Sequence, residues 1–230
     1  MKWRGILDIL KKHYEGYDED SRLVKDNAHK IEFITTTKVL DEKIKENSDI
    51  LEVGAGTGRY SFYYLDQGHS ITSVEKVPKH IEIMETKKKE KKNISEINIK
   101  HGDARDLSDF NDNSFDVVLC LGPLYHLREL NDRKKVISEC LKVLKSDGIL
   151  AVAYINRYAQ FITHINRDKD YINDEQMQNL IESGKTFYGD DCFYFATSRE
   201  IEGLMEQYKV EKLDHVGTDG IVNMMRDEIN

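Results

Sequence analysis

Short apolar runs alternate with longer amphipathic stretches through the middle of the chain. Apolar residues cluster or alternate within stretches of five to seven residues, a length typical of strands, and the stretch 115–121 is nearly continuous in apolar residues, as in a strand covered on both faces. The stretches between them repeat apolar residues with the period of a helix. The expected strands are 49–53, 70–75, 97–101, 115–121 and 149–154, and the helices expected between them are 59–67, 79–92 and 131–144. Since crossovers between parallel strands are right-handed, this alternation predicts an α/β fold with a doubly wound, mostly parallel sheet.

An N-terminal helical extension, residues 1–48, precedes the first expected strand. Apolar residues recur at helical spacing near its start, and a second helix is expected over about residues 27–45. The threonine run 35–37 counts against this second helix, because β-branched side chains lose rotamer freedom in helices. The α/β core then covers residues 49–155.

The pattern changes after the fifth expected strand. Residues 156–197 mix many aromatic residues with charged ones, and a helix is expected over 172–183. An insertion at the ligand end of a sheet predicts a cap that closes over the site and selects the substrate, while an ordinary packing subdomain is the alternative. The last part of the chain, 198–230, is expected to supply a helix with Ser198 as its N-cap and an antiparallel edge strand over 210–216.

Composition narrows the class of protein. At 230 residues the chain is long enough for one domain, or one domain with a cap. The net charge of −8 argues against a nucleic-acid-binding surface. Three cysteines without C-x-x-C spacing indicate a reduced, cytoplasmic protein with no metal site. No apolar run is long enough to span a membrane, and charges interrupt the first ten residues, so no signal peptide is expected. The lysine-rich run 87–92 is interpreted as a solvated helix face.

Three glycines lie between the first expected strand and its helix. Gly54, Gly56 and Gly58 form a G-x-G-x-G run that follows the acidic Glu52. Glycine allows a ligand to lie against the backbone, and such a turn marks the ligand end of a parallel sheet. The dinucleotide fingerprint would need glycine at the position of Arg59, and a P-loop would need Gly-Lys-Ser/Thr. The turn therefore indicates a nucleoside-like ligand bound in another way.

The segment E-V-G-A-G-T-G, residues 52–58, resembles the first motif of the class I S-adenosylmethionine-dependent methyltransferases. The string F-D-V-V-L-C-L-G-P-L-Y-H-L at 115–127 is similar to the fourth motif of the small-molecule members, and L-K-V-L-K-S-D-G-I-L-A-V at 141–152 resembles their fifth strand region. The resemblance covers about residues 30–155. It implies a Rossmann-like fold and S-adenosyl-L-methionine as cofactor. The cofactor-binding residues implied at the first motif are Glu52, Gly54, Ala55, Gly56, Thr57 and Gly58.

Further cofactor contacts are expected at the ends of the second and third strands. Glu75 ends the second strand, where a carboxylate can accept hydrogen bonds from both ribose hydroxyls. Lys76 is expected to flank the adenine, and the resemblance places Asp103 and Ala104 against its edge. The alternatives are a surface glutamate at Glu75 and a simple Gly-Asp turn before Ala104.

The resemblance places the reaction centre after the fourth strand. Backbone carbonyls near Leu121 and Gly122 are expected to hold the cofactor ammonium, and Tyr125 and His126 to face the reacting atoms. His126 is a candidate general base, with capping of the next helix as the alternative. The candidate substrate residues are Tyr14, Tyr17, Arg22 and Tyr154, and packing of the extension onto the sheet is the alternative for the first two.

These residues predict an enzyme that transfers a methyl group to an oxygen or nitrogen atom of a small molecule by in-line displacement, leaving S-adenosyl-L-homocysteine. A protein that binds the cofactor without catalysis remains an alternative, because binding does not establish chemistry. A nicotinamide-dependent oxidoreductase would share the sheet, but the G-x-G-x-x-G spacing that it needs is absent from this chain. The resembling family usually closes its sheet with a further strand, yet residues 222–226 favour a helix, so either this strand is missing or the chain ends before it. An unpaired edge favours dimerisation, and a monomer or homodimer is expected.

Overall fold

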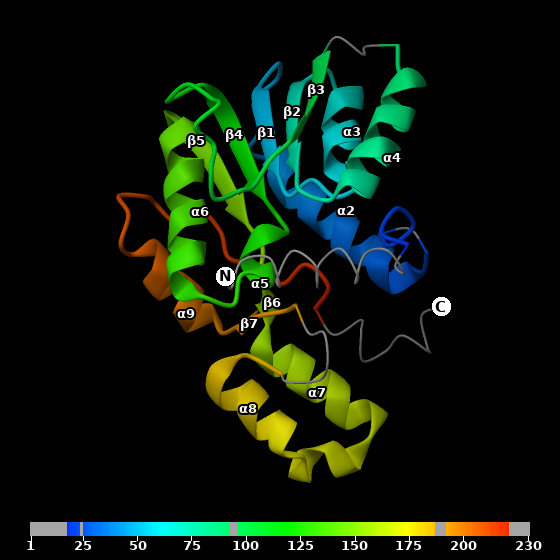
Figure 1. Ribbon diagram of the computed structural model, residues 1–230, viewed down its shortest axis with the longest axis vertical. Helices are drawn as coiled ribbons and strands as arrows, with labels where there is room; N and C mark the ends of the chain where they lie inside the picture. Colours follow the sequence, from blue (N-terminus) through cyan, green and yellow to red (C-terminus); the bar gives the residue numbers. More distant parts are fainter. Residues whose placement is uncertain (1–17, 24, 93–95, 187–191, 221–230) are drawn as a thin grey trace.

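The computed structural model describes residues 18–23, 25–92, 96–186 and 192–220 (Figure 1). The helix expected near the N-terminus, the candidate residues Tyr14 and Tyr17, and the segment 222–226 lie outside the described residues.

Five parallel strands form the central sheet. They are β1 (Asp49–Val53), β2 (Ser70–Glu75), β3 (Ile97–His101), β4 (Phe115–Cys120) and β5 (Leu144–Val152), in the order β3-β2-β1-β4-β5. The predicted doubly wound parallel sheet is confirmed. The order reverses direction at β1, so the glycine turn that follows β1 lies at the switch point, where sheets of this kind bind ligands.

Helices cover both faces of the sheet (Figure 1). One layer holds α2 (Asn27–Asp41), α3 (Arg59–Asp66) and α4 (Pro78–Lys89). The other holds α5 (Pro123–His126), α6 (Leu130–Val143) and α9 (Ser198–Met205). Alternate strand residues point to opposite faces. Ile50 and Val117 therefore join the core under α3, and Leu51 and Val118 join the core under α6.

The fifth strand, expected over 149–154, begins five residues earlier and ends at Val152. Helix α6 ends at Val143 and β5 begins at once with Leu144. The pairing of β4 with β5 shifts register between Phe115 and Val117, and this irregularity accommodates the polar residues without a turn. Gly148 permits the close approach of the strands, because a Cβ there would lie 2.8 Å from the carbonyl oxygen of Asp116.

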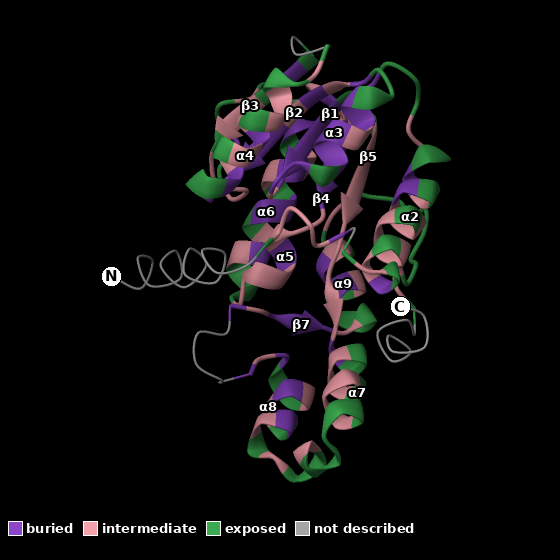
Figure 2. Cartoon of the chain, turned by 90° about the vertical axis from the view of Figure 1, so that its right-hand side faces the viewer, coloured by how far each residue is buried: buried purple, intermediate pink, exposed green. Residues whose placement is uncertain are grey.

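The segment after β5 forms a separate layer that projects away from the sheet (Figure 2). It contains β6 (Ile155–Asn156), α7 (Arg157–Arg167), a 3₁₀ helix, η2 (Lys169–Asn173), α8 (Glu175–Ser183) and β7 (Phe195–Ala196). Its small core includes Met177, Leu180 and Phe195. The helix expected over 172–183 starts at Glu175, because Asp174 caps it by accepting a hydrogen bond from the amide of Gln176. Helix α7 was not among the elements expected from the sequence.

Two expectations for the last described residues are wrong. The N-cap of α9 is Thr197, not Ser198, and Thr197 forms a capping box with Glu200. Residues 210–216 form no strand, and three of their apolar side chains are exposed. Side-chain contacts position this segment instead: Asp214 pairs with Lys43 at 2.6 Å, and His215 contacts Tyr154. Among the described residues, β5 therefore remains an edge of the sheet.

No helix within the described ranges is both long enough and apolar enough to span a membrane. Cys120 and Cys140 are buried in the core between the sheet and α6.

Candidate functional site

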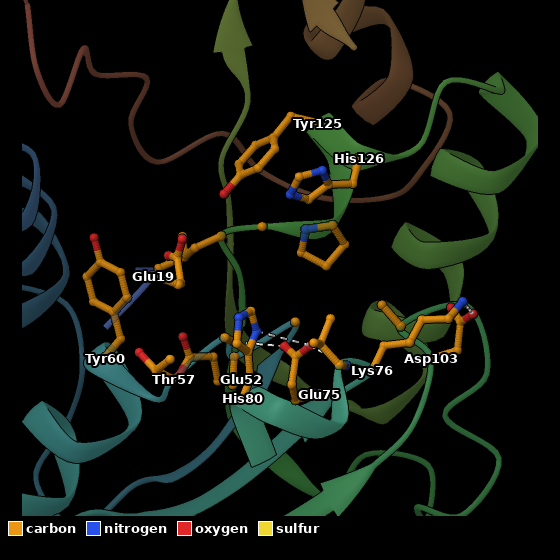
Figure 3. A pocket seen from close by; sticks show the side chains of 18 of the residues that line it. Glu19, Glu52, Thr57, Tyr60, Glu75, Lys76, His80, Asp103, Tyr125 and His126 are labelled. Atoms are coloured by element: carbon orange, nitrogen blue, oxygen red, sulfur yellow. Dashed lines mark hydrogen bonds and ion pairs between the residues drawn. The ribbon is translucent and has the colours of Figure 1, made fainter. Parts of the chain in front are cut away.

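A cavity opens at the carboxyl ends of β1, β2 and β4 (Figure 3). Its walls come from the N-terminal segment 18–23, the glycine turn, the residues after β2 and β3, and α5 with the loop that follows it. Every residue predicted to bind the cofactor lines this cavity except Gly58. The sheet therefore brings these residues together although they are spread over about 70 positions, from Glu52 to Gly122.

Strand β2 holds the glycine turn in place. The amides of Gly54 and Ala55 donate to the carbonyl oxygen of Val74 at 2.8 and 3.2 Å. A Cβ added at Gly56, whose φ is +56°, would meet only Glu19 Cγ, at 3.7 Å, so this part of the backbone is open to the cavity. A bound molecule can therefore approach the turn closely.

Gly58 serves packing instead. It precedes α3 with φ +80°, and a Cβ there would lie 2.9 Å from Met84 Cγ and from Phe62 Cε2. A side chain at this position would push α3 away from α4. The third glycine of the motif therefore indirectly shapes the cavity.

Glu75 joins the glycine turn to the end of β2. Its Oε2 accepts from the amide of Gly56 and its Oε1 from the amide of Val77, both at 2.7 Å. A carboxylate oxygen has two acceptor positions, so each oxygen keeps one for a ligand. The Nδ1 atom of His80 lies 3.7 Å from Oε1 of Glu75, and His80 also lines the cavity. His80 was not among the predicted site residues, although its position on the first turn of the helix after β2 could have suggested it.

Glu52 is a buried acid beneath the turn, with 3 % of its surface exposed. Its carboxyl group accepts a hydrogen bond from the Ser61 hydroxyl, which lies 2.7 Å from the Ser73 hydroxyl. Burial raises the pKa of Glu52 to about 7, although the bond from Ser61 opposes this shift. Glu52 therefore changes charge near neutral pH.

The carboxylate of Asp103 is already engaged by the chain. Oδ1 accepts from the amide and Nε of Arg105 at 3.0 and 2.9 Å, and Oδ2 accepts from Lys76 Nζ at 2.5 Å and Arg105 Nη2 at 2.6 Å. Burial alone would raise the pKa of Asp103, but these bonds hold it well below its usual range. Its four acceptor positions are filled. Asp103 thus orients the Lys76 ammonium and the Arg105 guanidinium at the cavity. Ala104 is therefore the better candidate for direct contact with a nucleobase.

Tyr125 and His126 project from α5 on the opposite side of the cavity from Glu52 and Glu75 (Figure 3). Their rings meet edge to face with centroids 4.8 Å apart. Burial raises the pKa of Tyr125, so its phenol remains protonated at neutral pH. Tyr125 can therefore donate a hydrogen bond to a ligand but does not serve as a base there.

The N-terminal segment 18–23 lies against the glycine turn. Arg22 lines the cavity while its Nε donates to Glu19 at 2.9 Å and its Nη1 to both oxygens of Glu32, at 3.1 and 3.0 Å. Lys87 Nζ donates to the Asp20 carboxylate and, at 3.0 Å, to the carbonyl oxygen of Thr57 in the turn. The interpretation of the lysine run as a purely solvated face is therefore wrong for Lys87.

The cap contributes no side chain to the lining of the cavity within the described residues. Tyr154, a candidate substrate residue, also lies elsewhere: its hydroxyl is 2.9 Å from both Ser198 Oγ and His215 Nε2. Tyr154 follows β5, and its ring packs toward α9. The segment 18–23, which carries the predicted substrate residue Arg22, does contribute to the wall of the cavity.

Comparison with known proteins finds similarity to methyltransferases over the part of the chain that carries the cavity. Residues 51–152 match the methyltransferase domain family. An uncharacterised methyltransferase of Bacillus subtilis, YcgJ, is 27 % identical over 128 residues, which cover 53 % of this chain and 48 % of the relative. The chain spans about half or less of the length of the first curated relatives that it matches.

Solved structures share the fold. The PH0226 protein of Pyrococcus horikoshii is 21 % identical with a TM-score of 0.68, covering 90 % of this chain and 94 % of that one. A SAM-dependent methyltransferase of Methanosarcina mazei is also 21 % identical, with a TM-score of 0.60, covering 74 % of this chain and 82 % of that one. At this identity the likeness establishes the architecture alone.

Proposed function

We propose that this chain binds S-adenosyl-L-methionine and transfers its methyl group to an oxygen or nitrogen atom of a small molecule, because residues 51–152 match the methyltransferase domain family and form a sheet with the class I methyltransferase fold. The observation that carries the proposal is the pairing of Gly56 with Glu75 at the cavity wall. This pairing places the exposed backbone of Gly56 beside the Glu75 carboxylate, whose oxygens can each accept one more hydrogen bond.

The residues of the cavity fit this cofactor. Glu75 would accept from the ribose hydroxyls, and the backbone from Gly54 to Thr57 would lie against the methionine part. Lys76 and Ala104 would border the adenine, and the carbonyl groups of Leu121 and Gly122 would receive the ammonium. The cavity also carries several carboxylates, which suits a cationic ligand.

When bound, the cofactor supplies a methyl group that its sulfonium has already activated. The work left to the protein is to align the acceptor and exclude water, which can lower a barrier by about 7–11 kcal/mol. We assign alignment to Tyr125, whose protonated phenol donates a hydrogen bond, and to Arg22, which also lines the cavity. His126 would take the proton that an oxygen or nitrogen acceptor must lose.

Thermal unfolding tests the proposal directly. At a hundredfold excess over Kd, S-adenosyl-L-methionine or S-adenosyl-L-homocysteine should stabilise the protein by about 2.7 kcal/mol, which raises Tm by about 5 °C or more. NAD should leave Tm unchanged. A shift with NAD but none with either S-adenosyl compound would reject the assignment. Formation of S-adenosyl-L-homocysteine with a panel of alcohols, phenols and amines then separates an enzyme from a protein that only binds the cofactor.

Replacing Lys87 with methionine should weaken cofactor binding about fivefold. The variant loses both the ion pair to Asp20 and the hydrogen bond to Thr57, so the segment 18–23 and the turn are held less firmly. A partly exposed pair of this kind is worth about 1 kcal/mol. Calorimetric titration with S-adenosyl-L-homocysteine gives the affinity, and Lys89→Met, an exposed lysine at the end of the same helix, is the control. Equal affinities of the two variants would show that Lys87 has no such role.

A further inference from the structure

The four-residue helix α5 depends on contacts with the cap. Helices this short are not stable by themselves, so tertiary packing must hold the rings of Tyr125 and His126 in place. The ring of Phe193 supplies this packing: its centroid lies 5.0 Å from that of His126 and 6.2 Å from that of Tyr125. The amide of Tyr194 also donates to the carbonyl oxygen of Tyr125 at 2.7 Å. The segment around Phe193 therefore supports the site from behind, without lining the cavity.

The segment that carries Phe193 is fixed at its far end by Arg157. This arginine begins α7 and only 4 % of its surface is exposed. Its Nε donates to the carbonyl oxygen of Phe195 at 3.0 Å, and its Nη1 to that of Ile181 at 3.1 Å. Its Nη2 donates to both oxygens of Glu200, at 2.7 and 2.8 Å. One buried guanidinium therefore joins β7 to α7, α8 and α9.

The surroundings of Arg157 are shaped to fit it. Gly184 ends α8 with φ +69°, and a Cβ there would lie 2.6 Å from Arg157 Nη2 and 2.1 Å from the carbonyl oxygen of Phe195. Lysine cannot replace arginine here, because one ammonium group cannot reach acceptors that the planar guanidinium spans. Arg133 holds the middle of the segment, because its guanidinium lies 3.7 Å from the centre of the Tyr194 ring.

We propose that Arg157 is a positioning residue that fixes the His126 ring at the cavity through the segment from Phe195 to Phe193. The chain of contacts is continuous: Arg157 holds the Phe195 carbonyl, Tyr194 bonds to α5, and Phe193 lies against His126. The cap acts on the reaction centre by this route. The orientation of His126 is a property of the chain by itself, whereas its kinetic consequence depends on the function proposed above.

Nuclear magnetic resonance of the full chain with labelled histidine tests the proposal. The ring signals of His126 are assigned by their loss in His126→Gln. In Arg157→Lys these signals should move by more than their line width, and in Glu200→Gln, which weakens only one side of the arginine, they should move less. Arg167→Lys, an exposed arginine at the end of the same helix, should leave them unmoved. The signals of His80, across the cavity, should remain in place in all three variants.

Unmoved His126 signals in a folded Arg157→Lys protein would overturn the proposal. Should that variant fail to fold, unmoved signals in Glu200→Gln would do the same. Equal movement of the His126 and His80 signals would also reject it, because that result indicates a general disturbance. The measurement needs neither cofactor nor acceptor, so a failure of the proposed function would leave it interpretable. With an acceptor in hand, Arg157→Lys should lower kcat and leave the KM for the cofactor unchanged.

Discussion

Replacing Glu75 with alanine should weaken binding of S-adenosyl-L-methionine by about 100-fold. A hydrogen bond to a charged group contributes about 1.5–3 kcal/mol, and the variant would lose two to the ribose, or about 3 kcal/mol in all. It also leaves the amides of Gly56 and Val77 without their acceptor, so the turn itself loosens. Isothermal titration calorimetry gives the affinity of the wild type and the variant.

Two further variants separate the contact with the ligand from damage to the turn. Glu75→Gln keeps the shape and one acceptor oxygen, so it should bind with intermediate affinity. Glu82→Gln, an exposed acid on α4, should bind like the wild type. Unchanged affinity in a folded Glu75→Ala protein would remove Glu75 from the cofactor site.

The second large effect concerns stability and pH at Glu52. Burial raises its pKa from the usual 4.5 to about 7, so the folded protein binds a proton that the unfolded chain releases between these values. The contribution of Glu52 to the free energy of unfolding is therefore greatest below pH 4.5. It falls by about 3 kcal/mol as pH rises to 7, and changes little above that.

Glu52→Gln should remove this dependence. Between pH 5 and pH 8 the variant should gain about 3 kcal/mol relative to the wild type, because its side chain has no proton to lose. Urea unfolding at both pH values measures the difference. Glu182→Gln, an exposed acid on α8, should show the same dependence as the wild type. A constant difference between wild type and Glu52→Gln would mean that Glu52 titrates normally in the folded state.

The sheet and the cofactor side of the site could be predicted from local patterns. The four strands from Asp49 to Cys120 could be placed almost to the residue, because apolar residues alternate or cluster within each, and β4 is nearly continuous in apolar residues, as a strand covered on both faces should be. The glycine turn and Glu75 follow from the chemistry of the turn and from their separation in a βαβ unit. These features depend on short stretches of sequence, so no distant contact was needed to find them.

Roles that depend on contacts between distant parts of the chain could not be predicted in the same way. Lys87 contacts Asp20, which is 67 positions away, and nothing local distinguishes Lys87 from the lysines beside it. Tyr154 follows a strand that ends at the site, yet its ring turns toward Ser198. Helix α7 begins at Arg157, a charged residue that its sequence would place at the surface. Contacts with three other elements bury it instead. Such roles depend on tertiary contacts that periodicity does not encode.

A crystal structure of the protein with S-adenosyl-L-homocysteine tests the central claim most directly. We expect the nucleoside in the cavity between the glycine turn and α5, with both ribose hydroxyls donating to Glu75 and the adenine beside Ala104. A nucleoside bound elsewhere, or a ribose without contact to Glu75, would contradict the account.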